Sequence, residues 1–281
     1  TTVQDLAVLK RVIVQNVSPT GVAVLNATDP TVAAMASKCR GSVTFFAVDK
    51  FHPVMATHRA QGQAVVYVEN GHIVASKGDM QQAIALAAIP ITMGGLIPFQ
   101  VENVMASVAA AWALGLDWDT IRKGLSSFSN DTHNAQGRFN FFKYRGATVI
   151  ADYGHNPDAM IALVQAVQTM PATRRTVVIS GAGDRRDQDI RQQTEILGDA
   201  FDEVILYEDQ CQRGRRDGEV IALLRQGLAH ARRTTQTSEI KGEFLAIDTA
   251  MDKLMADELC LILVDQVEDA LAHITAKVNK G

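Results

Sequence analysis

The second half of the chain alternates strand patterns with helix patterns, and this alternation constrains the fold more than any other feature. Short apolar runs predict strands over 148–151, 176–180, 203–207, 244–247 and 260–264. Amphipathic segments between and after them predict helices over 157–169, 187–200, 218–231, 248–256 and 267–277. Repeated strand–helix–strand units are typical of a parallel sheet with helices on both faces. Ligands of such sheets bind beyond the carboxyl ends of the strands, so candidate residues are sought there.

The first half predicts a mixed α/β domain. Strands are expected over 12–17, 21–25, 43–48, 64–69 and 72–76, and helices over 31–38, 101–114 and 117–128. Asn70-Gly71 separates the last two strands and is the dipeptide most typical of a tight hairpin turn. The segment 101–114 is apolar nearly all round, which predicts a buried helix.

A polar segment without periodicity, 129–137, separates the two halves. It places the hinge between two domains near 136–142. The expected fold class is α/β, with one domain over 1–138 and a second domain over 139–281.

Composition and charge exclude several classes of protein. The 281 residues are 47% hydrophobic and 21% charged, with a formal net charge of -4. This charge does not favour nucleic acid or an anionic membrane as a partner. Prolines and glycines interrupt the most apolar stretch, 83–99, so a membrane span is not expected there, and no cleavable targeting segment is expected. Three widely spaced cysteines give neither a disulfide framework nor a metal-ligand spacing, so a reducing, cytoplasmic setting is expected.

The loop after the strand 148–151 gathers four functional groups. It reads Asp152-Tyr153-Gly154-His155-Asn156 and is followed by Pro157. A carboxylate here could bind ribose hydroxyls, and an aromatic ring or imidazole could pack on a purine. Asn156 before Pro157 is also a good helix N-cap. Both a ligand site and a helix cap therefore remain open for this loop.

The loop after the strand 176–180 reads Gly-Ala-Gly-Asp-Arg-Arg-Asp over 181–187. Its two glycines allow close backbone approach by a ligand, and arginine suits bidentate binding of carboxylate or phosphate. A solvated charged helix cap is the alternative. A nicotinamide-dependent oxidoreductase is not indicated, because Arg186 occupies the third glycine position of the dinucleotide fingerprint.

Other strand ends and one helix carry further polar candidates. Glu208 and Asp209 precede a basic loop with Arg213 and Arg215, a combination that suits a zwitterionic or cationic amino acid but is also common on solvated surfaces. Asp265 and Gln266 are weaker candidates, because a helix cap alone would explain them. Asn103 lies alone in an apolar helix, where it either satisfies neighbouring backbone or faces a ligand.

Taken in order, these segments resemble the Mur ligase family, whose members join amino acids to carboxylates at the expense of ATP. The matching segments are 25–30, Asn103, 137–140, 152–157 and 181–187. The segment 152–157 is similar to the family's Asp-Tyr-Ala-His-Asn-Pro, with Gly154 in place of alanine. The resemblance implies a partial central, ATP-binding domain over 1–138 and a Rossmann-like C-terminal, amino-acid-binding domain over 139–281.

Within the family, the segments 183–187 and 208–215 resemble the branch of the cyanophycin synthetases. These enzymes build a poly-aspartate backbone and attach arginine to its side-chain carboxylates. The resemblance therefore implies that arginine or another amino acid and a carboxylate-bearing peptide polymer are the partners, and that ATP and Mg²⁺ are the cofactors. Because the central domain is only partial, one edge of its sheet is expected to be exposed. A homo-oligomer is a possible partner state, since a second copy of the chain would cover that edge.

The same resemblance implies three sets of site residues. Those expected to bind ATP are Asn103 near the adenine, Arg138 at the hinge, Asp152 at the ribose, and His155 and Asn156 in the same pocket. Those expected at the acyl phosphate or the incoming amino acid, as the catalytic set, are Asp184, Arg185 and Arg186. Those expected to bind the amino acid are Glu208, Asp209, Arg213 and Arg215.

One family feature is missing. The chain contains no Gly-x-x-x-x-Gly-Lys-[Ser/Thr] phosphate loop, and it begins with Thr1 rather than methionine. The magnesium ligands that accompany this loop in the family are missing too. The expectation is therefore a ligase fragment that is inactive by itself. Two alternatives remain open: another Mur-type ligase, of the UDP-MurNAc-peptide or folylpolyglutamate type, and a non-catalytic amino-acid-binding module.

Overall fold

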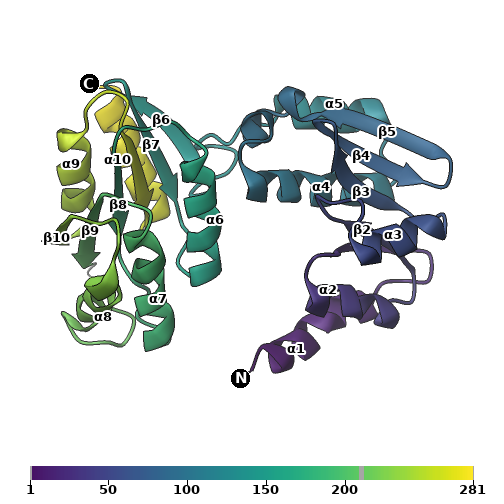
Figure 1. Ribbon diagram of the computed structural model, residues 1–281, viewed down its shortest axis with the longest axis horizontal. Coiled ribbons are helices and arrows are strands. Elements are labelled where there is room, and N and C mark those ends of the chain that lie inside the picture. Colours follow the sequence, from purple (N-terminus) through teal and green to yellow (C-terminus); the bar gives the residue numbers. More distant parts are fainter. Residues whose placement is uncertain (1, 209–211, 281) are drawn as a thin grey trace. The chain divides into compact units, whose positions relative to one another are not determined.

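The computed structural model describes residues 2–208 and 212–280. They form two compact units, Thr1–Phe128 and Ser129–Gly281 (Figure 1). Among the described residues, no helix is long and apolar enough to cross a membrane.

The first unit contains a five-stranded sheet in the order β1-β2-β3-β4-β5. Its strands are β1 (Val22–Asn26), β2 (Ser42–Phe46), β3 (Val65–Glu69), β4 (His72–Lys77) and β5 (Met80–Ala85). The first three strands are parallel, and the last two continue as an antiparallel meander. The predicted Asn70-Gly71 hairpin is confirmed, since both residues have positive φ angles of 50° and 73°.

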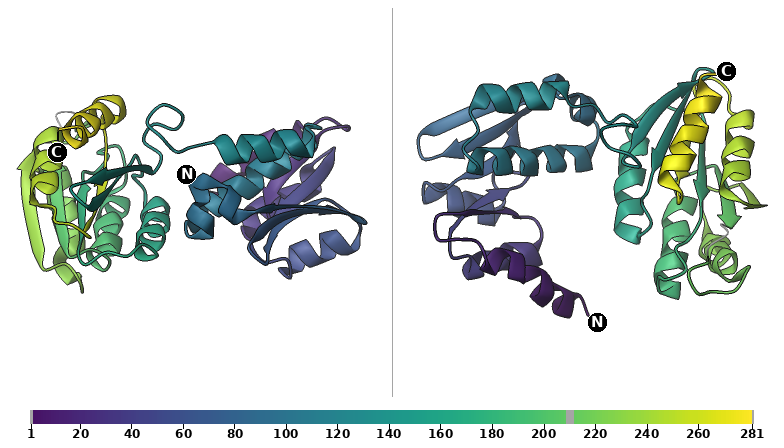
Figure 2. Two further views of the ribbon diagram at one scale, coloured as in Figure 1. Left: turned by 90° about the horizontal axis from the view of Figure 1, so that it is seen from above. Right: turned by 180° about the vertical axis from the view of Figure 1, so that it is seen from behind.

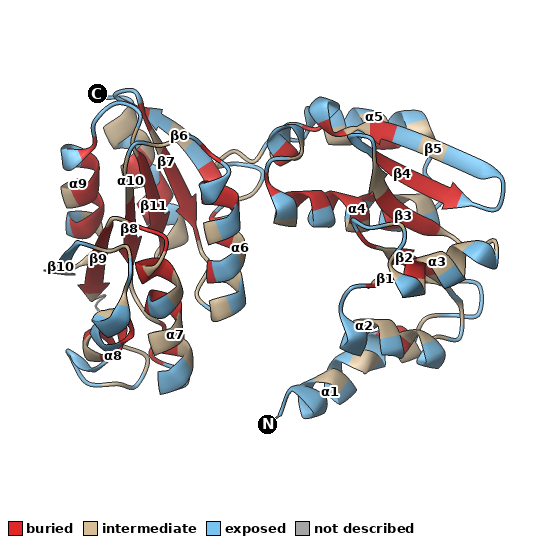
Figure 3. Ribbon diagram, viewed as in Figure 1, coloured by how far each residue is buried: buried red, intermediate tan, exposed pale blue. Residues whose placement is uncertain are grey.

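Helices cover both faces of this sheet. They are α1 (Val3–Gln15), α2 (Pro30–Ala34), α3 (Pro53–Ala60), α4 (Pro98–Ala113) and α5 (Trp118–Ser127), with short 3-10 helices η1 (Met35–Lys38), η2 (Leu86–Ala88) and η3 (Pro90–Gly95). Apolar side chains of α4 and α5 pack on one face of the sheet, and those of α1, α2 and α3 pack on the other. The strands β3 and β4 are consequently largely buried, whereas β5, at the edge of the sheet, is mostly exposed (Figure 3).

Two predictions for the first unit are wrong. The segment 12–17 was expected to be a strand, but it belongs largely to α1. The Thr2 side chain accepts a hydrogen bond from the Asp5 amide at 3.1 Å, and the Asp5 carboxylate accepts one from the Thr2 amide at 2.8 Å. This reciprocal cap starts a helix that outweighs the weak strand preference of the valines. The helix α4 is buried along one face rather than all round.

The second unit contains a six-stranded sheet in the order β10-β9-β8-β11-β7-β6. Its strands are β6 (Asn140–Tyr144), β7 (Ala147–Asp152), β8 (Arg175–Ile179), β9 (Glu203–Glu208), β10 (Gln236–Lys241) and β11 (Leu259–Leu263). All neighbouring strands are parallel except β6 and β7. The predicted parallel sheet is therefore confirmed, with one antiparallel strand added at its edge.

Helices lie on both faces of the second sheet as well. They are α6 (Pro157–Gln168), α7 (Asp187–Gly198), α8 (Glu219–Gly227), α9 (Glu243–Lys253) and α10 (Val267–Val278), with a 3-10 helix η4 (Leu228–His230). The helices α9 and α10 pack on one face, and α6, α7 and α8 lie on the other (Figures 1 and 2). This arrangement leaves the loops after the parallel strands together at the carboxyl edge of the sheet.

The predicted strand over 244–247 is wrong, because these residues lie in α9. Gly242, with a φ of +101°, ends the preceding strand, and Glu243 begins the helix. Buried Ala246, Ile247 and Ala250 follow with helical spacing. The strand that lies between β9 and β11 in the chain is instead β10.

The boundary between the compact units also differs from the prediction. The first unit ends at Phe128 rather than at residue 138, because the polar segment 129–137 folds around the buried side chain of Asn140. Its amide group donates to the carbonyls of Asn130 and Asp131 at 3.1 Å and of Ala135 at 2.8 Å. The side-chain oxygen Oδ1 of Asn140 accepts a hydrogen bond from the Gly137 amide at 2.8 Å. These bonds tie the segment to the second unit.

Candidate functional site

The carboxyl edge of the second sheet brings four loops together. They follow β7, β8, β9 and β11, which lie next to one another in the order β9-β8-β11-β7. The polar loops predicted after strands therefore meet at one edge, as expected for a parallel sheet. Asp209 and Cys211, in the loop after β9, lie outside the described residues.

Arg213 connects these loops. Its Nη2 atom donates to the Asp265 carboxylate at 2.7 Å, and its Nη1 atom lies 3.6 Å from the Asp184 carboxylate. It also forms a hydrogen bond with the Tyr153 side chain, which raises the pKa of the guanidinium. The Arg213 side chain remains 29% exposed. Arg213, in the loop after β9, thus contacts residues that follow three other strands and remains partly exposed, as a ligand-binding cation requires.

Arg215 has a different environment. It donates to the carbonyls of Gly183 and Arg185, both at 2.7 Å, and forms ion pairs with Asp187 at 2.8 Å and Glu219 at 2.9 Å. Its side chain is only 15% exposed. These contacts describe a residue that fixes the loop after β8, although the sequence assigned it to amino-acid binding.

A second contact fixes the same loop. A Cβ atom at Gly183 would lie 2.1 Å from the carbonyl oxygen of Gln212. The glycine predicted to allow close approach by a ligand therefore allows close approach by the neighbouring loop. The loops after β8 and β9 are held together at this point.

The three residues expected to be catalytic have unequal environments. Asp184 is 56% exposed and faces Arg213. Arg185 is exposed, and its amide donates to the Ala182 carbonyl at 3.0 Å. Arg186 is 79% exposed and binds Asp189 of α7 with two bonds, at 2.7 and 2.9 Å. Asp184 thus contacts Arg213 through its side chain, and Arg185 contacts Arg215 through its backbone carbonyl.

Side chains at both ends of the loop after β7 accept hydrogen bonds from backbone amides. Asp152 is 8% exposed, and its carboxylate accepts hydrogen bonds from the amides of Phe139 at 2.8 Å and Gly154 at 2.6 Å. Burial raises the pKa of Asp152, whereas these two hydrogen bonds and the positive charge of Arg138 act to lower it. Asn156 caps α6 by accepting from the Ala159 amide at 2.9 Å. The capping alternative for Asn156 is confirmed.

The other residues expected at ATP have more open side chains. His155 packs edge-on against Tyr153, with ring centroids 4.4 Å apart, and its Nδ1 atom lies 2.6 Å from the Tyr153 carbonyl oxygen. Arg138 is exposed on the loop before β6. Asn103 is exposed on α4 and donates to the Gln100 side chain at 3.2 Å, so it does not satisfy neighbouring backbone.

Glu208 binds the backbone of the loop that follows its own strand. Its carboxylate accepts a hydrogen bond from the Gly218 amide, just before α8. It therefore shapes the end of the loop after β9. The resemblance implies instead that Glu208 binds the amino acid.

Sequence reasoning missed Glu243, the most buried carboxylate at this edge. It is 1% exposed and accepts hydrogen bonds from the amides of Asp265 at 2.8 Å and Gln266 at 3.0 Å. It was missed because a strand was predicted over 244–247, where the helix α9 lies. A glycine followed by an acidic residue and a helical apolar pattern is the sequence feature that could have revealed it.

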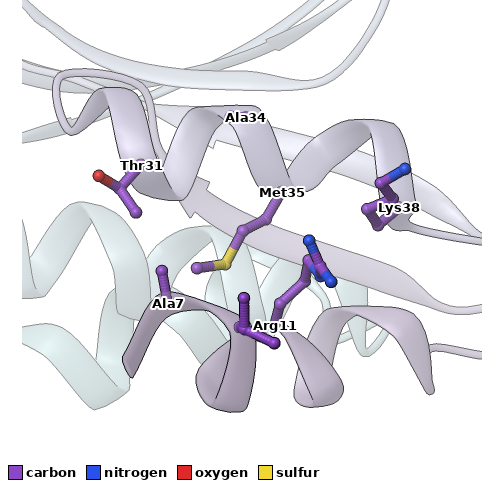
Figure 4. A pocket seen from close by; sticks show the side chains of 7 residues that line it. Ala7, Arg11, Thr31, Ala34, Met35 and Lys38 are labelled. Carbon is purple, nitrogen blue, oxygen red and sulfur yellow. The ribbon is translucent and has the colours of Figure 1, made fainter. Parts of the chain in front are cut away.

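A separate hollow lies in the first unit between α1 and the helices α2 and η1 (Figure 4). Apolar side chains, including Ala7 and Met35, line it, and Arg11 reaches from α1 toward Met35 and Lys38. The Nε atom of Arg11 is buried and has no hydrogen-bond partner. None of the predicted site residues lies in this hollow.

The residues that the structure describes contain no group of three or more His, Cys, Asp and Glu side chains placed to hold a metal ion.

Comparison with known proteins agrees with this architecture. Residues 137–264 match the family model for the glutamate ligase domain of Mur ligases. The chain is 35% identical, over its entire length, to a cyanophycin synthetase from Synechocystis sp., of which it covers 32%. It is 26% identical, over 85% of its length, to a UDP-N-acetylmuramoyl-L-alanyl-D-glutamate–2,6-diaminopimelate ligase from Alkaliphilus metalliredigens, of which it covers 45%.

A solved structure shows the same fold. The bifunctional folylpolyglutamate synthase/dihydrofolate synthase of Yersinia pestis, complexed with AMPPNP and a manganese ion, superposes with a TM-score of 0.64 at 18% identity. The match covers 99% of this chain and 58% of that one. The chain thus spans about a third of the cyanophycin synthetase and little more than half of this ligase. With a family domain over residues 137–264 and similarity along its whole length to ligases of one kind, the chain belongs to the Mur ligase family.

Proposed function

We propose that this chain serves as the amino-acid-binding part of an ATP-dependent amide ligase. The proposed reaction adds arginine to the aspartate side-chain carboxylates of a poly-aspartate backbone. The observation that supports it most is the meeting of Arg213, Asp184 and Asp265 at the carboxyl edge of the second sheet. Similarity to cyanophycin synthetases along the whole chain supports the choice of arginine.

The charges at this edge suit an amino acid with a cationic side chain. Arg213 can pair with the substrate's α-carboxylate, since guanidinium and carboxylate form strong charge-assisted bonds. Asp184 is more than half exposed and can receive the substrate's cationic end. Both charges follow strands of one rigid sheet, which holds the amine in a fixed direction for attack.

The residues near the loop after β7 fit the nucleoside end of ATP. Arg138 and His155 offer accessible polar side chains there, while Asp152 holds the loop in place. ATP, when bound, supplies the phosphoryl group that activates the acceptor carboxylate. The sequence contains no lysine-bearing glycine loop for the β- and γ-phosphates. We therefore expect the chain alone not to turn over ATP.

Calorimetric titration of the chain with L-arginine, L-lysine, L-ornithine and diaminopimelate tests the proposal. We expect arginine to bind most tightly and the Arg213→Met variant to bind it about tenfold or more weakly, since a charge-assisted bond is lost. Arg216→Met is the matched control, because Arg216 is exposed and lies in the same loop. Preference for diaminopimelate would favour a cell-wall ligase. If none of the four amino acids binds, the proposal is contradicted.

A second candidate is a non-catalytic amino-acid-binding module. The missing phosphate loop favours it. Both candidates predict arginine binding, but they differ in turnover by a ligase that contains this chain. ATP hydrolysis that requires both arginine and a poly-aspartate primer would exclude the second candidate.

A further inference from the structure

The inference begins at a buried carboxylate outside the predicted site. Glu243 is the first residue of α9, and both of its oxygens accept backbone amides of the turn after β11, at 2.8 and 3.0 Å. Amide donors and the amino end of a helix both stabilise a negative charge. Because Glu243 is 1% exposed, this charge is not available to a ligand. Its structural effect is to fix the backbone of Asp265 and Gln266.

Asp265 links Glu243 to Arg213. Asp265 lies two residues before Val267, where α10 begins. Its carboxylate accepts a hydrogen bond from Nη2 of Arg213 at 2.7 Å. Asp265 is therefore held through its amide and holds Arg213 through its side chain.

Arg213 needs such support. It has a positive φ of 48°, and Gly214 after it has a φ of 92°, so the loop follows an unusual path at this point. A long side chain on a loop of this kind loses considerable conformational freedom when it is fixed. The bond to Asp265 supplies that restraint before a ligand arrives, and less entropy is then lost on binding.

We propose that Asp265 is a positioning residue for Arg213 and that Glu243 acts through Asp265. Together they orient the guanidinium for the α-carboxylate of the incoming amino acid. This inference rests on the proposed function for its ligand, whereas the positioning itself is a property of the ligand-free chain. The ligand class is an α-amino acid with a free carboxylate.

The ligand-free part is tested by NMR of the Arg213 guanidinium in the full chain. Restricted rotation keeps the two Nη signals separate, and free rotation merges them. We expect separate signals in the unmodified chain and merged signals in Asp265→Asn and Glu243→Gln. Asp269→Asn is the control, because it removes the same charge from an exposed position on α10. Separate signals in both test variants, with folding confirmed by circular dichroism, would overturn the proposal.

The ligand-binding part compares L-arginine with agmatine, which is the same molecule without its α-carboxylate. We expect Asp265→Asn to weaken arginine binding about tenfold and to leave agmatine binding unchanged. A general structural defect would weaken both ligands equally, and that result would overturn the proposal. If the unmodified chain binds neither ligand while the NMR result is as expected, the proposed function fails and the positioning of Arg213 stands.

Discussion

At the scale of single residues, Arg213 and Arg215 show how environment decides the role of a side chain. They lie two positions apart in one basic loop, and the sequence assigned both to amino-acid binding. Arg215 is enclosed by two carbonyls and two carboxylates, whereas Arg213 faces two carboxylates and keeps an open side. We infer that Arg215 fixes the loops that form the site and that Arg213 binds the ligand.

The Asp131 carboxylate provides a test at the same scale. Hydrogen bonds from the Ser129 hydroxyl and from the amides of Asn134 and His133 lower the pKa of Asp131 to about 2. In the unfolded chain this pKa is about 3.9. The stabilisation from ionised Asp131 is therefore fully present above pH about 4 and is lost as the pH falls toward 2.

We expect Ser129→Ala to raise the pKa of Asp131 toward its ordinary value, because the first of these bonds is removed. A ¹³C carboxyl titration of the folded chain measures it. Ser126→Ala, near the end of α5, is the control and should leave the Asp131 titration unchanged. A midpoint in Ser129→Ala that stays at about 2 would show that the hydroxyl has no such effect.

At the scale of elements, the residues that start or end a helix had more effect than the strand or helix preference of the residues inside it. Valines at 12 and 14 favour a strand, yet the Thr2–Asp5 cap starts a helix that continues through this segment. The same holds at Gly242, where a positive φ ends one element and Glu243 starts α9. Element type was predicted well where turn chemistry was explicit, as in the hairpin of β3 and β4.

Two glycines offer a matched test of this point. A Cβ atom at Gly71 or Gly124 would meet no neighbour within 4 Å, but only Gly71 has a positive φ. We expect Gly71→Ala to destabilise the chain by about 1 kcal/mol because alanine is strained in this region. Gly124→Ala, in α5, should stabilise it by about 0.5 kcal/mol or more. Equal effects in denaturant unfolding would show that backbone conformation does not control this turn.

At the scale of the whole molecule, the compact units have separate hydrophobic cores. Two buried clusters lie between Val14 and Ile121, and another lies between Tyr144 and Ile274. Each cluster joins a sheet to its own helices. We therefore expect the second unit to fold without the first.

Two fragments test both the independence and the boundary. The fragment 129–281 should unfold cooperatively, as monitored by circular dichroism. The fragment 139–281, cut at the predicted boundary, loses the three carbonyl partners of Asn140 and should be less stable by about 2–3 kcal/mol. Equal stability of the two fragments would mean that segment 129–138 contributes nothing to the second unit.

The sequence by itself determined the α/β class, the parallel sheet of the second unit and the loops that carry its polar residues. These features follow from local periodicity and turn chemistry, which act within a few residues. The tertiary structure alone decided which polar residues meet. Strand β11, the last in the chain, inserts between β8 and β7 and so brings Asp265 to Arg213. Strand order depends on how helices pack across the sheet, and no local pattern encodes that packing.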